Sequence, residues 1–196
     1  MAHRPTIEAG RLVLRPFTLE DANAVARLAD DPGIAAMTLL IPHPYRPDHA
    51  VDWIRRHEPD FDSGRSLDLA VTRQDDGELL GAVGLTFEPD HNRACLGFWI
   101  GRPFWGRGYC TWAAAAVSRF AFETLGQHRV HSFHFVGNTP SGRVLEKIGM
   151  RREGLARQHV RKGDRYLDCV LYGMLQEDLR TPDHSPPQPF NKANRA

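Results

Sequence analysis

The sequence predicts a single mixed α/β (α+β) domain with a central, mostly antiparallel sheet of about seven strands, flanked by helices. Strand-like and helix-like segments are interspersed along the chain, which indicates one mixed domain. Residues 67–100 hold three apolar runs separated by short turns, a pattern typical of an antiparallel meander. With 196 residues, the chain is long enough to bury one full-sized hydrophobic core.

Turn and capping residues define the elements before residue 60. Residues 11–17 alternate weakly in hydropathy and meet a proline, so we expect a strand that ends there. Thr18 and Asp21 form a capping pattern for a helix that reaches about residue 29, where an Asp-Asp-Pro-Gly run stops it. Three prolines within residues 41–47 exclude a regular helix or a central strand. Short helices are expected on either side of that stretch, at residues 34–39 and 48–57.

The second half of the chain mixes strands with two further helices. An Asp-Asp-Gly-Glu turn at residues 75–78 predicts a hairpin, and Gly126 and Pro140 mark the end of one helix and the start of the next. The expected elements are strands at 67–72, 79–87 and 94–100, a helix at 108–125, a strand at 129–136, a helix at 139–148, and strands at 154–160 and 166–175.

Composition narrows the classes of partner and compartment. A formal net charge of +1 shows no basic excess, so nucleic acid is not expected as a partner. No apolar stretch approaches the roughly 20 residues of a membrane helix, and no signal core follows the N-terminus, so no membrane contact is expected. Cys95, Cys110 and Cys169 show neither metal-ligand spacing nor a disulfide framework, which favours a cytoplasmic protein without a metal site. We expect the domain to span residues 1–180 and the proline-rich tail, residues 181–196, to be disordered.

Residues 104–116, Phe-Trp-Gly-Arg-Gly-Tyr-Cys-Thr-Trp-Ala-Ala-Ala-Ala, carry the strongest functional signal. Gly106 and Gly108 allow positive φ and close backbone approach to a ligand. The following helix directs its positive dipole end and its free N–H groups at the same point, and Arg107 can add a cation, so the run predicts a diphosphate site. A Walker loop is excluded because no Gly-Lys-Ser/Thr follows, and a dinucleotide fingerprint is excluded because the third glycine is missing.

A second constellation, residues 138–150, follows the strand at 129–136. Asn138 lies where the strand opens into the next helix, and its amide can bond a ligand. Ser141 lies in the first helical turn, where its hydroxyl can donate outward. The alternative is purely local, with Asn138 or Thr139 capping the helix and Ser141 bonding the backbone.

Taken together, the two runs resemble the Gcn5-related N-acetyltransferase (GNAT) family, and most closely its ribosomal-protein N-terminal acetyltransferase (RimJ/RimL-like) branch. Residues 105–110 are similar to the acetyl-CoA loop of that family, and residues 138–150 to the Asn-x-x-Ser…Leu-Glu-Lys-x-Gly-Phe pattern of the branch. The opening strand, residues 11–16, also resembles that of the branch, so the likeness covers roughly residues 7–176.

The resemblance implies a set of cofactor-binding residues for acetyl-CoA. The CoA diphosphate would be held by backbone N–H groups of Trp105, Gly106, Arg107, Gly108, Tyr109 and Cys110. The pantetheine and the thioester would lie beside Phe98, Trp99 and Ile100, pairing with them as an added strand. That strand would splay from its neighbour near residues 135–136, Asn138 would bond the pantetheine arm, and Ser141 would lie near the sulfur.

The implied activity is direct transfer of an acetyl group to a primary amine, either a protein N-terminus or a small molecule, in a ternary complex. Glu88 is the first candidate for the base and Ser141 for the acid; a solvated turn carboxylate at 88, or a base at His131 or His134, stay open as alternatives. Tyr45 and Trp53 are expected to shape the acceptor pocket, with plain packing as the alternative. We expect a monomer or a homodimer.

Three positions depart from the family pattern. Leu145 stands where many relatives have a tyrosine, and Cys95 and Trp112 stand where the branch has glutamate. These departures leave two alternatives open: a non-catalytic acyl-CoA-binding or regulatory module, and a nucleotide-phosphate protein that uses the glycine turn differently. A covalent route through Cys95 or Cys110 is not expected, because neither has an adjacent histidine partner.

Overall fold

The computed structural model describes residues 3–180, so the predicted disorder of residues 181–196 lies outside the described residues. The strands are β1 Ile7–Ala9, β2 Leu12–Pro16, β3 Ser66–Arg73, β4 Leu79–Glu88, β5 Arg93–Ile100, β6 Arg129–Phe135, β7 Arg151–Lys162 and β8 Arg165–Met174. The helices are α1 Ala22–Ala29, α2 Pro32–Met37, α3 Pro47–Arg55, α4 His57–Asp62, α5 Tyr109–Glu123 and α6 Thr139–Lys147, with short 3₁₀ turns at Leu19–Asp21, Pro89–His91, Arg102–Phe104 and Gln176–Asp178. The mixed α/β class is confirmed.

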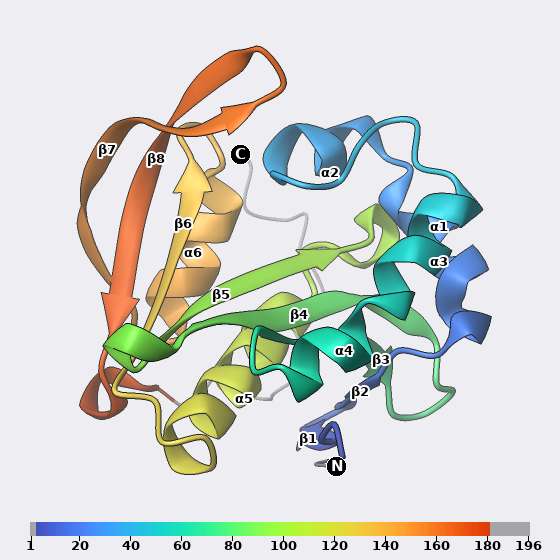
Figure 1. The fold of residues 1–196 in the computed structure, drawn as a ribbon, viewed down its shortest axis with the longest axis horizontal. Helices are drawn as coiled ribbons and strands as arrows, with labels where there is room; N and C mark the ends of the chain where they lie inside the picture. The colour runs from blue at the N-terminus through green and yellow to red at the C-terminus, as the bar shows by residue number, and fades with distance from the viewer. Residues whose placement is uncertain (1–2, 181–196) are drawn as a thin grey trace, which may run out of the picture.

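One sheet of eight strands, in the order β1-β2-β3-β4-β5-β6-β8-β7, forms the centre of the fold (Figure 1). Every neighbouring pair is antiparallel except β5 and β6. The sheet therefore has one strand more than the expected seven, and the additional strand is β1. The strand predicted at residues 11–17 is the second arm of a hairpin, because Gly10, with φ of 65°, turns the chain back onto the three-residue strand β1. A strand that short shows no readable alternation in the sequence.

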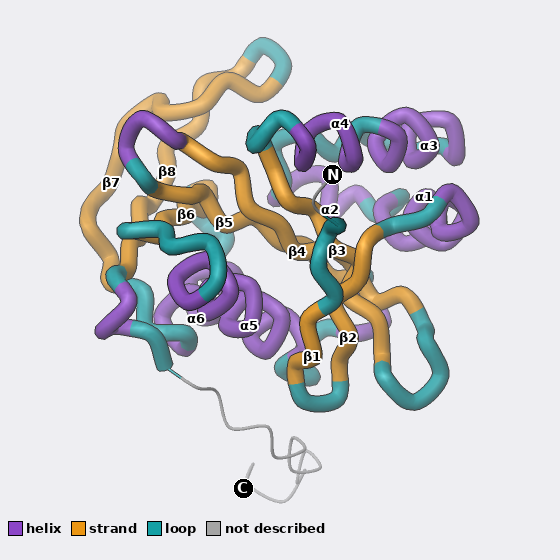
Figure 2. The backbone as a smooth tube through the Cα atoms, turned by 60° about the horizontal axis from the view of Figure 1, so that its bottom comes forward, coloured by secondary structure: helices purple, strands orange, loops and turns teal. Residues whose placement is uncertain are grey.

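Helices cover both faces of the sheet (Figure 2). Helices α5 and α6 pack on one face, where α5 contacts β4 and β5, and α6 contacts β6. Helices α1, α3 and α4 lie on the other, with α1 against β4 and α4 against β3. The apolar residues between these layers form one buried core. Among the helices of the described residues, none combines the length and the apolar character needed to cross a membrane.

Two helix boundaries differ from the sequence-based expectation. The Asp-Asp-Pro-Gly run was expected to stop one helix only, but Asp31 also begins the next, since its carboxylate accepts from the N–H groups of Gly33 at 2.8 Å and Ile34 at 3.2 Å. The helix expected to end near residue 57 is followed directly by a second short helix, α4. The first residue of α4, His57, has a buried imidazole ring. Burial against the sheet, which the local sequence does not show, adds this extra turn.

The parallel pair β5 and β6 separates soon after it begins. The two strands pair only over Arg93–Arg129, Ala94–Val130 and Cys95–His131. At the next position the Ser132 hydroxyl donates to the Leu96 carbonyl at 2.8 Å, in a buried position. Beyond that bond the strands diverge (Figure 1), so the expected split in the sheet is present, but it begins just after Ser132 and not near residues 135–136.

The β7–β8 hairpin closes one side of this split. Its tip bends toward α2 (Figure 1), and the Lys162 ammonium donates to the carbonyl oxygens of Ala35 and, at 2.6 Å, Thr38. A cation is favoured at this position because the carbonyl end of a helix carries the negative end of its dipole. The hairpin and the segment after α2 are therefore held together across the opening.

Candidate active site

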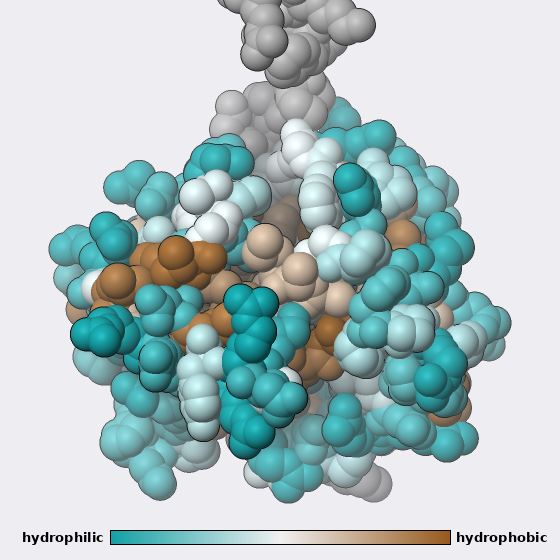
Figure 3. Space-filling view, turned by 90° about the horizontal axis from the view of Figure 1, so that it is seen from above, coloured by the Kyte–Doolittle hydropathy of each residue, from teal (hydrophilic) through white to brown (hydrophobic). Residues whose placement is uncertain are grey.

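A cavity of about 730 Å³ occupies the opening where β5 and β6 diverge. Its lining comes from the central strands, from residues 37–56 and from the first turn of α6. Seen from above, apolar side chains lie across the middle of this face between hydrophilic ones (Figure 3). Met37 and Leu40, which line the cavity, are exposed to 45% and 87%. The molecule therefore offers a half-open apolar cavity at the split, the usual character of a small-molecule site.

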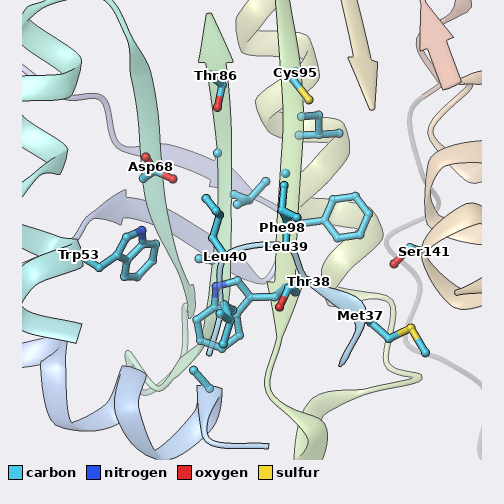
Figure 4. A pocket seen from close by; sticks show the side chains of 18 of the residues that line it. Met37, Thr38, Leu39, Leu40, Trp53, Asp68, Thr86, Cys95, Phe98 and Ser141 are labelled. Atoms are coloured by element: carbon cyan, nitrogen blue, oxygen red, sulfur yellow. The ribbon is translucent and has the colours of Figure 1, made fainter. Parts of the chain in front are cut away.

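The register of β3, β4 and β5 arranges the cavity floor in cross-strand rows. Paired residues of antiparallel strands point to the same face of the sheet. The three rows are Ser66–Thr86–Cys95, Asp68–Gly84–Gly97 and Ala70–Ala82–Trp99. The floor is thus polar in the first row, hollow over two glycines in the second and apolar in the third. Figure 4 shows Asp68, Thr86 and Cys95 on neighbouring strands, with Trp53 below them and Ser141 on the far side.

Phe98, Asn138 and Ser141 meet at the side of the cavity formed by β5 and α6. All three line the cavity, and Phe98 points from β5 toward the side where Ser141 lies (Figure 4). The side-chain oxygen Oδ1 of Asn138 also accepts from the Ser141 backbone N–H at 3.4 Å, which caps α6. The capping role that the sequence left open for Asn138 is therefore present, together with its place in the cavity wall.

The glycine loop lies beyond the carboxyl end of β5, outside the lining of the cavity. Gly106 and Gly108 have φ of 76° and 81°, a backbone region that favours glycine, and α5 begins at Tyr109. The first N–H groups of a helix have no partner within the helix, which makes this end an anion site. Trp105 is exposed and donates from its indole to the Ile100 carbonyl at 2.5 Å.

Neighbouring residues of the loop differ in their surroundings. Arg107 is exposed, and Tyr109 and Cys110 are half-buried. Ile100 is buried and lies outside the cavity lining, whereas Trp99 lines it. The structure therefore brings together only part of the residue set that the family resemblance implied.

Glu88 does not reach the cavity. It lies opposite Arg93 at the closed end of the split, and its carboxylate accepts from Arg93 at 2.6 Å and pairs with His131 Nε2 at 2.7 Å. Burial alone would raise the pKa of Glu88, but the hydrogen bonds from Arg93 and His131 outweigh it and lower the pKa. A carboxylate held by two partners is a weak proton acceptor. The other histidine, His134, lines the cavity, and its Nδ1 lies 2.9 Å from the Phe135 carbonyl.

Tyr45 and Trp53 both line the cavity on the side of α3. Trp53 packs edge-on against Phe17, with ring centroids 5.0 Å apart, and against His57, with centroids 4.5 Å apart. The Tyr45 backbone N–H donates to Asp30 at 2.9 Å, which fixes the proline-rich segment beside α1. Both aromatic residues are thus held firmly in one wall.

The departures from the family pattern have different surroundings. Leu145 and Trp112 are buried and lie outside the cavity lining, whereas Cys95 lines it. Burial raises the pKa of Cys95 to about 11 and that of Cys110 to about 12. Both thiols therefore keep their protons near neutral pH, which does not favour a cysteine nucleophile.

Sequence reasoning missed Asp68, Gly84, Gly97 and Thr86. Each looks like an ordinary member of an alternating strand, and only the strand register shows that they share one face. A signal was available in principle: an aspartate within a strand that is otherwise apolar is unusual enough to question. The segment after α2, which carries Met37 and Leu40, gave no pattern of its own.

The split sheet, the cavity at the split and the helix that begins at a glycine loop beyond β5 define an acyl-CoA-dependent transferase of the GNAT class. Residues 11–151 match the family model described as an acetyltransferase (GNAT) domain, so the chain belongs to the GNAT acetyltransferase family. It is an acetyl-CoA-dependent acetyltransferase.

Named relatives agree with this assignment. The chain is 27% identical over 179 residues to the uncharacterized N-acetyltransferase YoaA of Bacillus subtilis, covering 88% of this chain and 97% of the relative. It is 27% identical over 125 residues to the [ribosomal protein uS5]-alanine N-acetyltransferase of Escherichia coli, covering 63% and 62%. Among solved structures, Mycobacterium smegmatis RimJ in complex with CoA-disulfide superposes with a TM-score of 0.81 at 25% identity, covering 91% of each chain. The recognised family and branch are thereby confirmed.

Proposed function

We propose that this protein transfers the acetyl group of acetyl-CoA directly to a primary amine, either a peptide N-terminus or a small-molecule amine. One observation carries the proposal: a single cavity joins the β5–α6 side, with Phe98 and Ser141, to the α3 side, with Tyr45 and Trp53. Donor and acceptor can therefore meet in one place, and positioning them together supplies much of the rate increase. The RimJ neighbour, solved with CoA-disulfide, supports the choice of donor.

Two features of the chain fit CoA. The first turn of α5 offers backbone N–H groups next to two left-handed glycines, and an anionic diphosphate is favoured there. Beyond Cys95, the edge of β5 that faces β6 has no strand partner in the described part of the chain, so its backbone groups can pair with an extended arm. We assign the diphosphate to residues 105–110 and the arm to β5, Asn138 and Ser141.

Phe98 supplies the best candidate for a donor to the acetyl oxygen. Residues along a strand present their N–H and C=O groups alternately to the two edges, and Leu96 faces β6 because Ser132 bonds its carbonyl. Phe98, two residues on, therefore presents its N–H on the same open edge. A single donor of this kind is worth roughly 3–4 kcal/mol in the transition state. Bound acetyl-CoA supplies an activated thioester, and Ser141 lies where it can donate to the departing sulfur.

The acceptor is proposed as an amine of small cross-section. A ribosomal-protein acetyltransferase among the relatives supports a peptide N-terminus, and the walls formed by Tyr45 and Trp53 suit a short side chain beside it. The three cysteines are free thiols, and we keep the cytoplasm as the proposed compartment. The proposed oligomeric state remains a monomer or a homodimer.

The loop assignment is tested by isothermal titration with CoA. Gly108→Asp places a carboxylate at the anion site, and we expect CoA affinity to fall by more than tenfold. Gly108→Asn is the matched control, because asparagine tolerates the left-handed backbone and adds no charge. If both variants fold and bind CoA as the unaltered protein does, the assigned loop is wrong.

The reaction itself is tested by thiol release from acetyl-CoA with a panel of amines that includes an alanine-initiated peptide. Turnover of at least one amine supports the proposal. CoA binding without turnover of any amine would instead favour the non-catalytic module. A larger thermal shift with ATP or NAD than with CoA would favour the nucleotide-phosphate alternative.

A further inference from the structure

Within residues 3–180, Asp68 is the one carboxylate on the cavity floor formed by the three cross-strand rows of β3, β4 and β5. Its neighbours in the floor are uncharged: Ser66 and Thr86 in the first row, Gly84 and Gly97 in its own. Ser66 donates to Asp68 Oδ2 at 3.0 Å, and the structure pairs no arginine or lysine with this carboxylate within residues 3–180. Arg56 also lines the cavity, and its positive charge acts to lower the pKa of Asp68, but it forms no ion pair with this carboxylate within residues 3–180. A cationic ligand can therefore supply the close partner that the negative charge lacks.

Gly84 makes room for this carboxylate. A Cβ at Gly84 would lie 2.7 Å from Asp68 Oδ1 and 2.8 Å from the Leu67 carbonyl oxygen, so only glycine lets the side chain lean over β4. A Cβ at Gly97, the next residue in the row, would meet no atom within 4 Å. The carboxylate therefore leans from β3 over β4, and the hollow above Gly97 lies on β5, the next strand, about 5 Å further across the sheet and beside Phe98.

We propose that Asp68 binds the ammonium group of the acceptor in the hollow over Gly84 and Gly97 and takes the first proton from it. This inference rests on the proposed acetyl transfer and adds to it the residue that receives the amine. Trp53 and Leu40 supply apolar surface to the cavity beside this floor (Figure 4). The substrate class that fits is a cationic primary alkyl amine.

The proton and bond changes balance with Asp68 as the base. Asp68 takes one proton from the ammonium, and the freed nitrogen pair forms the C–N bond to the acetyl carbon while the C–S bond breaks. The second proton leaves the nitrogen for the departing thiolate, and Asp68 releases its own proton to water. The products are the acetylated amine, free CoA thiol and one proton in solution.

The electrostatic surroundings suit this role. Burial is the largest effect on the pKa of Asp68 and raises it. The hydrogen bond from Ser66 and the charge of Arg56 lower the pKa, the charge of Asp60 raises it, and the net result is a raised pKa. A carboxyl whose pKa is raised toward the working pH is a better proton acceptor than an ordinary one. The other titratable groups that line the cavity are Tyr45, His49, Asp52, Arg56, Cys95 and His134.

The first test measures binding alone, so it decides the subsite even if no amine is acetylated. The probes are n-butylammonium and n-butanol, which have equal length and differ in charge, titrated into the full chain and followed by NMR. We expect the unaltered protein to prefer n-butylammonium at least fivefold, Asp68→Asn to lose this preference, and Asp68→Glu to keep part of it. Equal affinity for both probes, or a preference unchanged in Asp68→Asn, overturns the inference.

The second test uses the amine panel and separates proton removal from folding. Asp68→Asn should lower kcat/KM for an alkyl amine by about 10²-fold or more, yet lower it less than fivefold for a hydrazide, which is already neutral at pH 7. Asp62→Asn, the same change at an exposed position of α4, should leave both rates unchanged. Equal losses for both acceptors would show a merely structural role and overturn the inference.

A pair of glycine variants checks the geometry. Gly84→Ala should displace the carboxylate and reduce the ammonium preference, whereas Gly97→Ala, which fills the hollow without touching Asp68, should weaken the binding of both probes alike and so keep the preference. Loss of the preference in Gly97→Ala with retention in Gly84→Ala would contradict the arrangement. Absence of turnover with every amine, alongside an intact ammonium preference, would count against the proposed transfer and not against the subsite.

Discussion

The buried imidazole of His57 should make the stability of this protein depend on pH. The ring is only 3% exposed, its Nδ1 and Nε2 have no hydrogen-bond partner in the described residues, and it packs against Trp53 and Phe17. Burial, aided by the positive charge of Arg4, lowers the pKa of His57 from 6.5 to about 4. The folded chain therefore keeps this ring neutral where the unfolded chain would protonate it.

The sign and the size follow from linkage. Because the folded-state pKa is depressed, the unfolded chain binds more protons between pH 6.5 and 4, so stability falls as pH falls through that window. The full depression corresponds to about 3 kcal/mol, and at pH 5 about 2 kcal/mol of it should already be lost. Against a typical total of about 5–15 kcal/mol, this loss is large.

Urea unfolding of His57→Phe at pH 7 and pH 5 measures the effect. Phenylalanine keeps an aromatic ring against Trp53 and cannot be protonated, so the drop in unfolding free energy between the two pH values should be about 2 kcal/mol smaller than in the unaltered protein. Comparing this drop between the variant and the unaltered protein cancels the groups that titrate equally in both. His91→Phe, in an exposed turn, is the matched control and should leave the drop unchanged. An identical drop in His57→Phe and in the unaltered protein would refute the reasoning.

Two further predictions concern the split in the sheet. Ser132→Ala removes the hydroxyl that bonds the Leu96 carbonyl and should lower the free energy of unfolding in urea by about 1–3 kcal/mol. Ser118→Ala, at a buried hydroxyl with no hydrogen-bond partner among residues 3–180, should be neutral or stabilising, and equal losses in the two variants would contradict the assigned role of Ser132. Lys162→Met should free the β7–β8 tip from the segment after α2, so amide exchange should be faster in both segments and the KM for the acceptor should rise. Arg165→Met, at the exposed end of the same hairpin, should change neither the exchange rates nor the KM. Unaltered exchange in Lys162→Met would show that the contact does not hold the hairpin.

Local patterns carried most of the fold prediction. The alternation at residues 129–136, the turn at 75–78 and the proline at 140 each depend on backbone preferences that act within a few residues, and the corresponding elements are present. The same holds for Gly106 and Gly108: both adopt positive φ, as their spacing before a helix indicates. Where the pattern was too short, as in β1, or depended on packing, as in α4, sequence reasoning failed.

The candidate site was predictable only in part, because its two halves depend on different information. Asn138 and Ser141 were found because they adjoin a helix start, which is a local feature. Glu88 was chosen because it follows a strand, but the register of β4, β5 and β6 places it against Arg93 and His131 at the closed end. Arg93 is only five residues from Glu88, across a short turn, but His131 comes from another part of the chain, and only the pairing of β5 with β6 brings it to this carboxylate.

The sequence by itself determined the family, the mixed α/β class and the glycine loop at the start of α5, since each depends on residues that are neighbours along the chain. Only the tertiary structure decided where β5 and β6 part, and that Asp68 stands over Gly84 and Gly97. A one-residue change in register would turn every one of these side chains to the other face of the sheet. Register is set by packing of the whole core, and no local segment of the chain contains that information.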